Sequence, residues 1–168
     1  RPVLKNIYEN GRLIAQEDGQ GNRKDFDHDL SANSSVVTDL DGRTTLFEYD
    51  NYGNVLTQTQ AIFDASYAGD IVTTFTYDGH NNQESKTIGS STWTTLHNST
   101  NDVIEARDPE GNSVFYENYN TRGQEGRIVD ERGNAHDMSY DALGNLYLVE
   151  GPSVTDVDTG STSRAYAG

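Results

Sequence analysis

The sequence predicts an all-β protein, an antiparallel meander of successive β-hairpins that forms a curved or spiral sheet. Three observations support this fold class. A Tyr-Asp-x-x-Gly-Asn motif recurs along the chain, a second Asp-x-x-Gly turn lies midway between its copies, and the segments between turns alternate as strands do. We interpret residues 1–168 as a single array of about seven to eight units.

The repeated unit is clearest in YDNYGNVL from Tyr49 and YDALGNLYL from Tyr140. We call the first residue of each copy the anchor, and we allow His as well as Tyr in that position. The anchors are then Tyr8, His28, Tyr49, Tyr77, His97, Tyr119 and Tyr140. Their spacings are 20, 21, 28, 20, 22 and 21 residues, so a unit has about 21 residues.

Two segments lengthen the spacing between turns. The interval of 28 residues contains AIFDASYAGDI, which we interpret as a loop insertion at 61–71. A second insertion is expected at 152–163, where PSVTDVDTGSTS precedes Tyr166.

The Asp-x-x-Gly segments are expected to be tight turns that join antiparallel strands. Asp caps such a turn with its side chain, and Gly takes the positive φ that follows a type I turn. DPEG at 108–111 adds a proline at the second position, where its fixed φ is favoured. The glycines expected in this role are Gly53 and Gly144 after anchors and Gly111 and Gly133 in the midway turns.

Strands of roughly six or seven residues fill the space between turns. Thr45, Phe47 and Tyr49 share one side of such a strand, and residues 72–77 and 136–140 alternate in the same way. We expect the anchors to form rows of aromatic rings across neighbouring hairpins.

Composition excludes several classes of partner and site. The formal net charge of −15 makes nucleic acid and anionic membranes unfavourable partners. There is no cysteine, so disulfides and thiolate sites are excluded, and no apolar run reaches the roughly 20 residues of a membrane span. The start RPVLKN lacks a signal-peptide pattern and an initiator Met, so we expect an excised or processed piece of a longer protein.

The tandem units, each with a second turn midway, resemble the YD repeats of Rhs-type proteins. This family includes bacterial Rhs and wall-associated toxins, the C subunits of Tc toxin complexes, and teneurins. The resemblance covers roughly residues 8–150 and implies a β-sheet spiral that closes into a hollow shell, which in the bacterial members encloses a C-terminal toxin. It implies that this chain is a piece of such a shell.

We predict no catalytic, cofactor or metal residue, and we keep the alternatives open. His28 and His97 replace a tyrosine ring, and metal binding is the alternative reading. DFDHD at 25–29 and DVDTG at 156–160 imitate calcium loops incompletely, so loop-bound calcium remains an alternative. Tyr52 and Trp93, with Tyr67 and Tyr147, are candidates for a ligand platform that binds a sugar, although packing on a strand face also explains them.

The sequence therefore predicts a non-enzymatic scaffold of a secreted or cell-surface bacterial protein. Its expected partner is its own C-terminal toxin or another polypeptide cargo, with self-association through exposed sheet edges. The alternative is an adhesion module that binds carbohydrate or protein. A hydrolase that uses a pair of carboxylates is the third reading, and no acidic residue stands out for that role.

Overall fold

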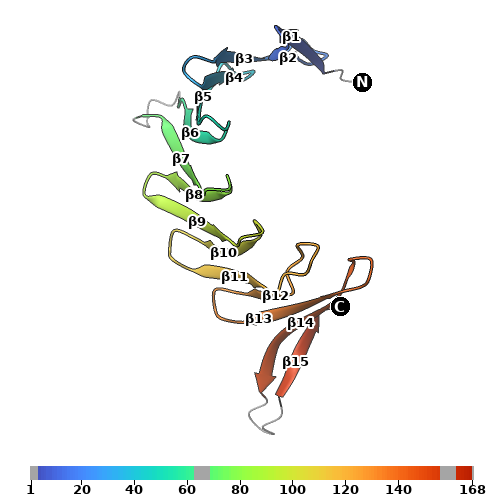
Figure 1. The fold of residues 1–168 in the computed structure, drawn as a ribbon. Coiled ribbons are helices and arrows are strands. Elements are labelled where there is room, and N and C mark those ends of the chain that lie inside the picture. Colours follow the sequence, from blue (N-terminus) through green and yellow to red (C-terminus); the bar gives the residue numbers. More distant parts are fainter. Residues whose placement is uncertain (1–3, 63–68, 156–161, 168) are drawn as a thin grey trace. The chain divides into compact units, whose positions relative to one another are not determined.

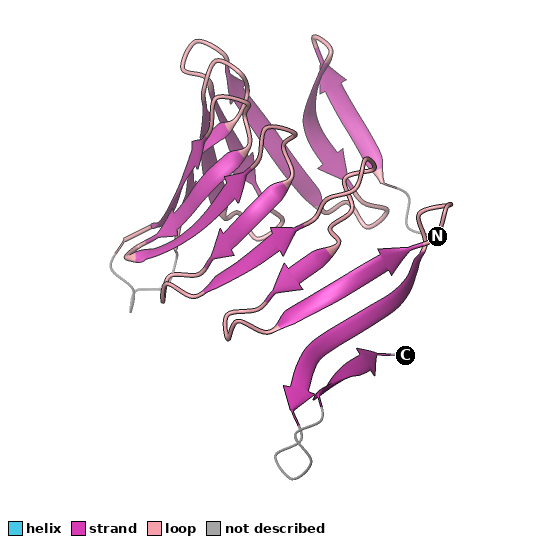
Figure 2. Cartoon of the chain, turned by 60° about the horizontal axis from the view of Figure 1, so that its bottom comes forward, coloured by secondary structure: helices cyan, strands magenta, loops and turns pink. Residues whose placement is uncertain are grey.

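The computed structural model describes residues 4–62, 69–155 and 162–167, and these residues form strands and turns without a helix (Figure 2). The chain divides into two compact units, Arg1–Ser91 and Thr92–Gly168, which we describe separately. Within each unit the strands follow one another in chain order, and each pairs antiparallel with the next (Figure 1). The predicted all-β antiparallel meander is therefore confirmed.

Unit 1 contains eight strands: β1 (Lys5–Glu9), β2 (Arg12–Glu17), β3 (Arg23–Asp29), β4 (Ser34–Thr38), β5 (Thr44–Tyr49), β6 (Val55–Gln60), β7 (Ile71–Tyr77) and β8 (Gln83–Ile88). Unit 2 contains seven: β9 (Ser91–His97, its first residue being the last of unit 1), β10 (Val103–Arg107), β11 (Ser113–Glu117), β12 (Arg127–Val129), β13 (Ala135–Tyr140), β14 (Leu146–Thr155) and β15 (Thr162–Ala167).

The strand register shifts at or beside several anchors. The shifts lie between Ile7 and Tyr8, Glu48 and Tyr49, Thr76 and Tyr77, and Ser139 and Tyr140. A bulge of this kind adds a residue to one strand and increases the local twist. Each of these four anchors therefore sits where its ladder changes register before the turn.

The two sides of the sheet differ in chemistry. We call the side that carries the anchors the anchor face. Cross-strand pairs place mostly aromatic and uncharged residues on it, for example Phe26 opposite Val37 and Phe47 opposite Gln58 in unit 1, where Lys24 and Lys86 are charged exceptions. In unit 2 the anchor face includes Val114, Tyr116, Ile128, His136, Met138 and Val149.

The opposite face of unit 2 carries charges in register. Glu117, Arg127, Asp137 and Glu150 face one another in sequence across β11 to β14. Arg127 Nε lies 2.9 Å from Asp137 Oδ1. This alternation of apolar and charged faces is the period of two that the sequence predicted.

The sheet has a single layer in the described chain, because no second layer of elements covers either side. Ala15 and Thr73 are the described side chains that are buried, at 0% and 5% exposure. Most anchor-face residues are half-buried by their neighbours in the sheet. Stability therefore comes from ladders, turns and contacts between adjacent hairpins rather than from a closed core.

Two predicted boundaries change. β6 ends at Gln60 and β7 begins at Ile71, so the insertion at 61–71 joins two strands, although its residues 63–68 lie outside the described chain. The loop expected at 152–163 is shorter than predicted, because β14 extends to Thr155 and β15 begins at Thr162. Paired strand backbone extends into the polar segment, and residues 156–161 are not described.

Candidate functional site: anchors and their turns

The turn that follows Tyr49 shows how the repeated motif closes. The backbone N–H of Gly53 donates to the carbonyl of Asp50 over 3.2 Å, and the N–H of Asp50 donates to the carbonyl of Asn54 over 2.9 Å. The Asp50 carboxylate accepts from the N–H groups of Tyr52 and Asn54 and from the Asn54 amide. One side chain thus satisfies the backbone donors inside its own turn.

The same two backbone hydrogen bonds close nine described turns, at 18–22, 39–43, 50–54, 78–82, 98–102, 108–112, 120–124, 130–134 and 141–145. The fourth residue has positive φ in each of them, and it is Gly in seven turns and Asn in the other two, Asn81 and Asn101. The predicted Gly53, Gly111, Gly133 and Gly144 all have this conformation, with φ from 81° to 91°. The anchor turns and the midway turns therefore have the same conformation and the same hydrogen bonds.

The turn carboxylates are held in their charged form. The pKa of Asp141 is lowered first by the hydrogen bond from the Asn145 side chain and then by backbone N–H groups of its turn. The same order of causes, with the asparagine four residues on as the first, lowers the pKa of four more carboxylates: Asp18, Asp78, Asp108 and Asp130. The asparagine that ends the motif thus stabilises the aspartate that begins the turn.

Four of the seven anchor side chains bond to a backbone carbonyl of the strand or loop before them. Tyr77 donates its hydroxyl to Val55 O over 2.9 Å, and Tyr140 donates to Glu125 O over 3.1 Å. Tyr119 donates to Val103 O in the same way. We call this interaction the anchor bond.

His28 makes the anchor bond with an imidazole instead of a phenol. Its Nε2 lies 3.0 Å from Leu13 O, and its Nδ1 lies 2.8 Å from Ser35 Oγ. A carbonyl only accepts, so the proton of neutral His28 is on Nε2. The predicted exchange of a tyrosine for a histidine ring is therefore a replacement of one donor by another at this position.

The acceptors of these bonds recur in the sequence. Val55, Val103 and Glu125 each lie six residues after the preceding anchor, and Leu13 lies five after Tyr8, whose turn is one residue shorter. The anchor bond joins the two strands of a hairpin at the end opposite the turn that connects them. The acceptor carbonyl thus has a fixed place in the repeat, counted from the preceding anchor.

The environment of these phenols favours the neutral, donating form. Burial raises the pKa of Tyr77, Tyr119 and Tyr140 above the ordinary value, and nearby carboxylates raise it further, Asp50 for Tyr77 and Glu125 for the other two. A phenolate could not donate the anchor bond.

The other anchors differ from these four. Tyr49 stacks on Phe47 of its own strand, with ring centroids 6.5 Å apart, and its N–H donates to Asn33 O. Tyr119 does make the anchor bond, although it lies beyond the end of β11, after Asn118 with φ 59°. His97 is the last residue of β9, and its buried Nδ1 has no hydrogen-bond partner among the described residues. Tyr8 is 61% exposed.

The sequence did not predict the anchor bonds or the contacts between consecutive anchor turns. Arg122 donates to Ala142 O over 2.7 Å, and Gln124 donates to Gly144 O over 2.8 Å. In unit 1, Asn54 donates to Asn81 Oδ1 over 3.1 Å. Long polar side chains at the third and fifth turn positions were the available signal.

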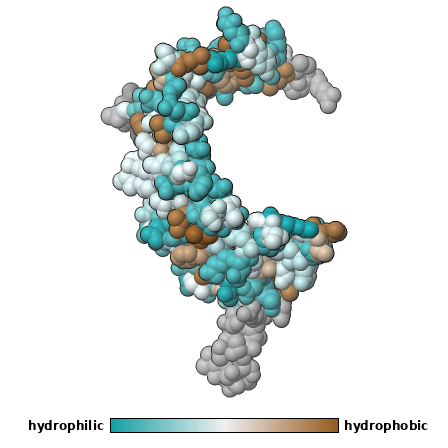
Figure 3. All heavy atoms as spheres, in the orientation of Figure 1, coloured by the Kyte–Doolittle hydropathy of each residue, from teal (hydrophilic) through white to brown (hydrophobic). Residues whose placement is uncertain are grey.

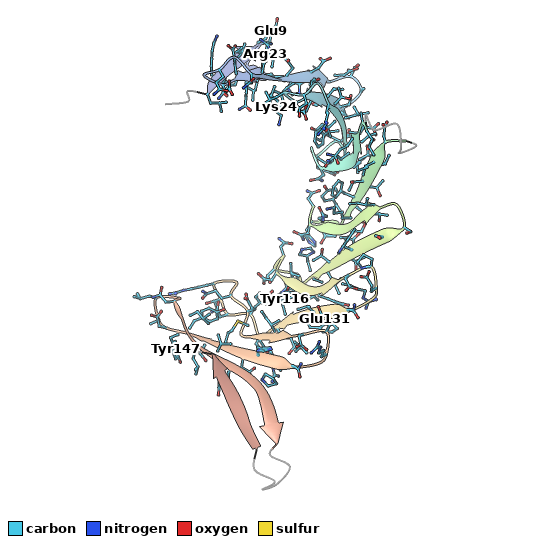
Figure 4. The ribbon with its side chains drawn as sticks, turned by 180° about the vertical axis from the view of Figure 1, so that it is seen from behind. Glu9, Arg23, Lys24, Tyr116, Glu131 and Tyr147 are labelled. Atoms are coloured by element: carbon cyan, nitrogen blue, oxygen red, sulfur yellow. The ribbon has the colours of Figure 1, made fainter. Side chains whose placement is uncertain are left out.

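The candidate sugar platform is not assembled by the residues that can be compared. Tyr52 is 81% exposed in an anchor turn of unit 1 (Tyr67 lies outside the described residues). Trp93 belongs to β9 and Tyr147 belongs to β14, both in unit 2, and Tyr147 is labelled in Figure 4. Five strand spacings separate them, about 24 Å, which exceeds one sugar ring. Carbohydrate binding stays a prediction.

The candidate calcium segment at 25–29 lies mostly in a strand. Asp25 pairs with Arg23 at 2.7 Å, and Asp29 accepts from the N–H groups of Ser31 and Ala32. The second candidate, 156–160, is outside the described chain. Among described residues, no group of three or more His, Asp or Glu is arranged to hold a metal ion. A search for helices long and apolar enough to cross a membrane finds none in that same part of the chain.

Comparison with known proteins points to one group. No family model matches the sequence. The tRNA nuclease WapA of Bacillus subtilis (strain 168) is 25% identical over 130 residues, which are 77% of this chain and 5% of that protein. The tRNA3(Ser)-specific nuclease WapA of Bacillus spizizenii is 26% identical with the same coverage. The chain thus spans about a twentieth of the length of these relatives.

Solved structures share the fold. The crystal structure of TcdB2-TccC3 superposes with a TM-score of 0.73 at 13% identity, over 96% of this chain and 9% of that one. The same complex without its hypervariable C-terminal region gives a TM-score of 0.71 at the same identity and coverage. The sequence likeness to WapA and the shared fold of TcdB2-TccC3 together support the interpretation of this chain as an Rhs-type YD-repeat fragment.

The YD-repeat assignment confirms the resemblance and corrects one expectation. The prediction of a protein that is not an enzyme is wrong for this group, because the curated relatives are named as tRNA nucleases. The error has a physical reason. Turn and strand patterns report on the repeated sheet, and they carry no information about the chemistry of a protein of which such a sheet is a twentieth.

Proposed function

We propose that this YD-repeat segment is a stretch of wall in a shell that encloses or displays another polypeptide, such as a toxin domain, in a secreted or surface bacterial protein. The observation that carries the proposal is the likeness to TcdB2-TccC3 over 96% of the chain. The nuclease names of the WapA relatives support a toxin-related cargo.

The local geometry suits a wall. Each turn satisfies its own backbone donors, and each anchor bond ties a hairpin to the element before it, so units can be added without a shared core. A continuous ladder leaves no gap between strands for another chain to pass through. The net charge of −15 supports a basic rather than an acidic cargo.

Protease protection tests this proposal on the full gene product that contains residues 1–168. We expect the segment that follows the repeats to resist proteinase K in the native protein. Gly111→Val places a branched side chain at φ 90° and should open the wall, so that the same segment is cleaved at least about tenfold faster.

Gly79→Ala is the matched control, because Gly79 lies in a turn but has an ordinary φ and open space around it. Its protection should equal that of the native protein. Equal cleavage of the following segment in the native protein and in Gly111→Val would refute enclosure.

A further inference from the structure

We propose that a pocket between two anchor turns of unit 1 binds the ε-ammonium group of a lysine side chain of another polypeptide. The pocket lies between the turn that follows His28 and the turn that follows Tyr49. The inference goes beyond the proposed function and does not depend on enclosure. It assigns a ligand chemistry to a site that lies within unit 1.

The pocket has a volume of about 350 Å³, near the lower end of the ~300–1,000 Å³ range of small-ligand sites. One of its two turns joins β3 to β4 and the other joins β5 to β6, so both lie at the same edge of the antiparallel meander (Figure 1). The residues that form it include Asp29, Asn33, Ser34, Tyr49, Asp50 and Asn51.

The Asp29 carboxylate keeps one oxygen without a hydrogen bond in the described chain. In the three other described anchor turns that begin with aspartate, the amide of the asparagine four residues on donates to Oδ2. Asp29 accepts three hydrogen bonds, and all of them go to Oδ1. Asn33, four residues on, instead donates its amide to Asn51 Oδ1 over 3.4 Å. Asp29 Oδ2 is therefore available to a ligand.

Tyr49 and Asn33 add two more available oxygens. Tyr49 is an anchor, yet its hydroxyl has no hydrogen-bond partner among the described residues, and its ring stacks on Phe47. Asn33 Oδ1 likewise accepts no hydrogen bond from that part of the chain. The pocket thus combines a carboxylate, an amide and a phenol oxygen with an aromatic ring, whose face attracts cations.

The charge of the pocket favours a cation. Asp29 and Asp50 are both ionised at neutral pH, and no Lys, Arg or His is among the described residues that line it. Hydrogen bonds, first that of the Ser31 side chain, lower the pKa of Asp29 further. An anionic ligand would be repelled by these carboxylates, whereas a cation is attracted.

The available acceptors suit an ammonium better than a guanidinium or a metal ion. A guanidinium binds a carboxylate best through two parallel hydrogen bonds, but Asp29 Oδ1 already accepts three. The Asp50 carboxylate is held by donors of its own turn, and no group of three metal-binding side chains occurs among the described residues. An ammonium has three donors on one atom, so it can bind Asp29 Oδ2 together with neutral oxygens.

The apolar part of the pocket suits the stem of a lysine. Leu30 lines the pocket and is 61% exposed, so it offers a surface to the methylene groups that carry the ammonium. A hydrated inorganic cation gains nothing from this surface. The net charge of −15 also attracts basic polypeptides at longer range.

A nuclear magnetic resonance titration of the full chain with the peptide acetyl-Gly-Lys-Gly-amide tests the site, at a constant ionic strength of ~0.1 M. The side-chain amide signals of Asn33 and Asn51 should shift and saturate with a Kd of about 1–10 mM, because a single exposed charged contact binds weakly. The same peptide with an acetylated lysine keeps most of the stem without the charge and should bind at least about tenfold more weakly. An arginine peptide should bind at least about threefold more weakly.

A charge-neutralising variant tests the role of Asp29. Asp29→Asn should raise the Kd at least about tenfold. Its turn should persist, because Asn98 accepts from the N–H and hydroxyl of the residue two positions on, as Asp29 does. Asp78→Asn is the matched control, since it makes the same charge change in an anchor turn of unit 1 outside the pocket, and it should leave the Kd unchanged.

Three outcomes would overturn the proposal. The first is an Asn33 signal that does not shift at about 50 mM lysine peptide. The second is an equal Kd for the acetylated peptide or for the Asp29→Asn variant. The third is binding of 1-aminopentane without binding of the lysine peptide, which would exclude a polypeptide as the source of the ammonium. None of these results depends on protease protection, so failure of this site and failure of enclosure are distinguishable.

Discussion

At the scale of single residues, one type of five-residue turn recurs along the described chain and reverses its direction between strands. Asp50 accepts three hydrogen bonds within its turn, and Gly53 takes φ 88° so that the chain can enter the next strand. Where the fourth residue is Asn81, φ is 66° and the hydrogen bonds persist. Asn tolerates this region better than other non-glycine residues.

A pair of glycines tests this reading. Gly53→Ala should destabilise unit 1 by about 1–2 kcal/mol, because the positive φ at this position is unfavourable for alanine. Steric contact does not contribute, since the added Cβ would meet no atom within 4 Å. Gly79→Ala, also in open space but at ordinary φ, should be neutral or slightly stabilising. Urea unfolding followed by circular dichroism measures both. Equal losses in the two variants would contradict a role for φ.

At the scale of the hairpin, the anchor bond adds a contact between two adjacent strands beyond the end of their backbone ladder. Tyr140 does not pair with Glu125 in the backbone ladder, yet its hydroxyl reaches that carbonyl where the β12–β13 ladder has ended. β12 is only three residues long, so this bond replaces ladder hydrogen bonds that a longer strand would make. The contact explains why the motif begins with a ring that carries a donor.

Removal of one hydroxyl tests the anchor bond. Tyr140→Phe should lower the free energy of unfolding of unit 2 by about 0.5–1.5 kcal/mol, the range for one hydrogen bond. Tyr147→Phe removes the same group from a ring that is 67% exposed and should have no measurable effect. Denaturant titration compares the two variants. A loss in Tyr147→Phe as large as in Tyr140→Phe would show that the hydroxyl contact is unimportant.

At the scale of the whole molecule, the stabilising contacts are spread over many turns and strand pairs and are not concentrated in one buried core. In Figure 3 the visible surface is mainly hydrophilic, with hydrophobic residues in separate groups. Nearly all described side chains keep some exposure, and each unit holds together through neighbouring strands. Turn carboxylates in both units therefore contribute in parallel.

This distribution predicts the effect of acid. A carboxylate whose folded pKa is lowered contributes stability above its unfolded pKa of about 3.9, and this stability is lost as the pH falls through the folded pKa. Asp141→Asn should therefore be less stable than the native chain at pH 7, and the difference should shrink below about pH 4. Urea midpoints at pH 7, 4 and 2.5 give the comparison.

Asp41→Asn is the control for the acid experiment, because Asp41 is exposed at the third position of its turn and donates its N–H to Asp39 rather than closing the turn. A native chain and Asp141→Asn variant that differ by the same amount at every pH would contradict the role of the carboxylate.

Much of the local structure was predictable because it depends on neighbours in the sequence. The turn after Tyr49 follows from Asp50 and Gly53 alone, and the alternation of Thr45 and Phe47 follows from the strand period. The end of β14 at Thr155 was not predictable, since pairing with β15 holds the polar backbone extended there. The enzymatic relatives were missed because the repeat pattern reports on the sheet and not on the chemistry of the much longer proteins that contain such repeats.

The sequence by itself determined the hairpin, its length and its turn, because each is set by residues within about 21 positions of one another. Only the tertiary structure decided what the anchors do. The bond from Tyr77 to Val55 joins residues 22 apart across an insertion, and its partner is a backbone carbonyl that every residue type carries. Because every residue carries a backbone carbonyl, no residue type marks the acceptor in the sequence. Only the arrangement of the strands in space identifies which carbonyl accepts the bond.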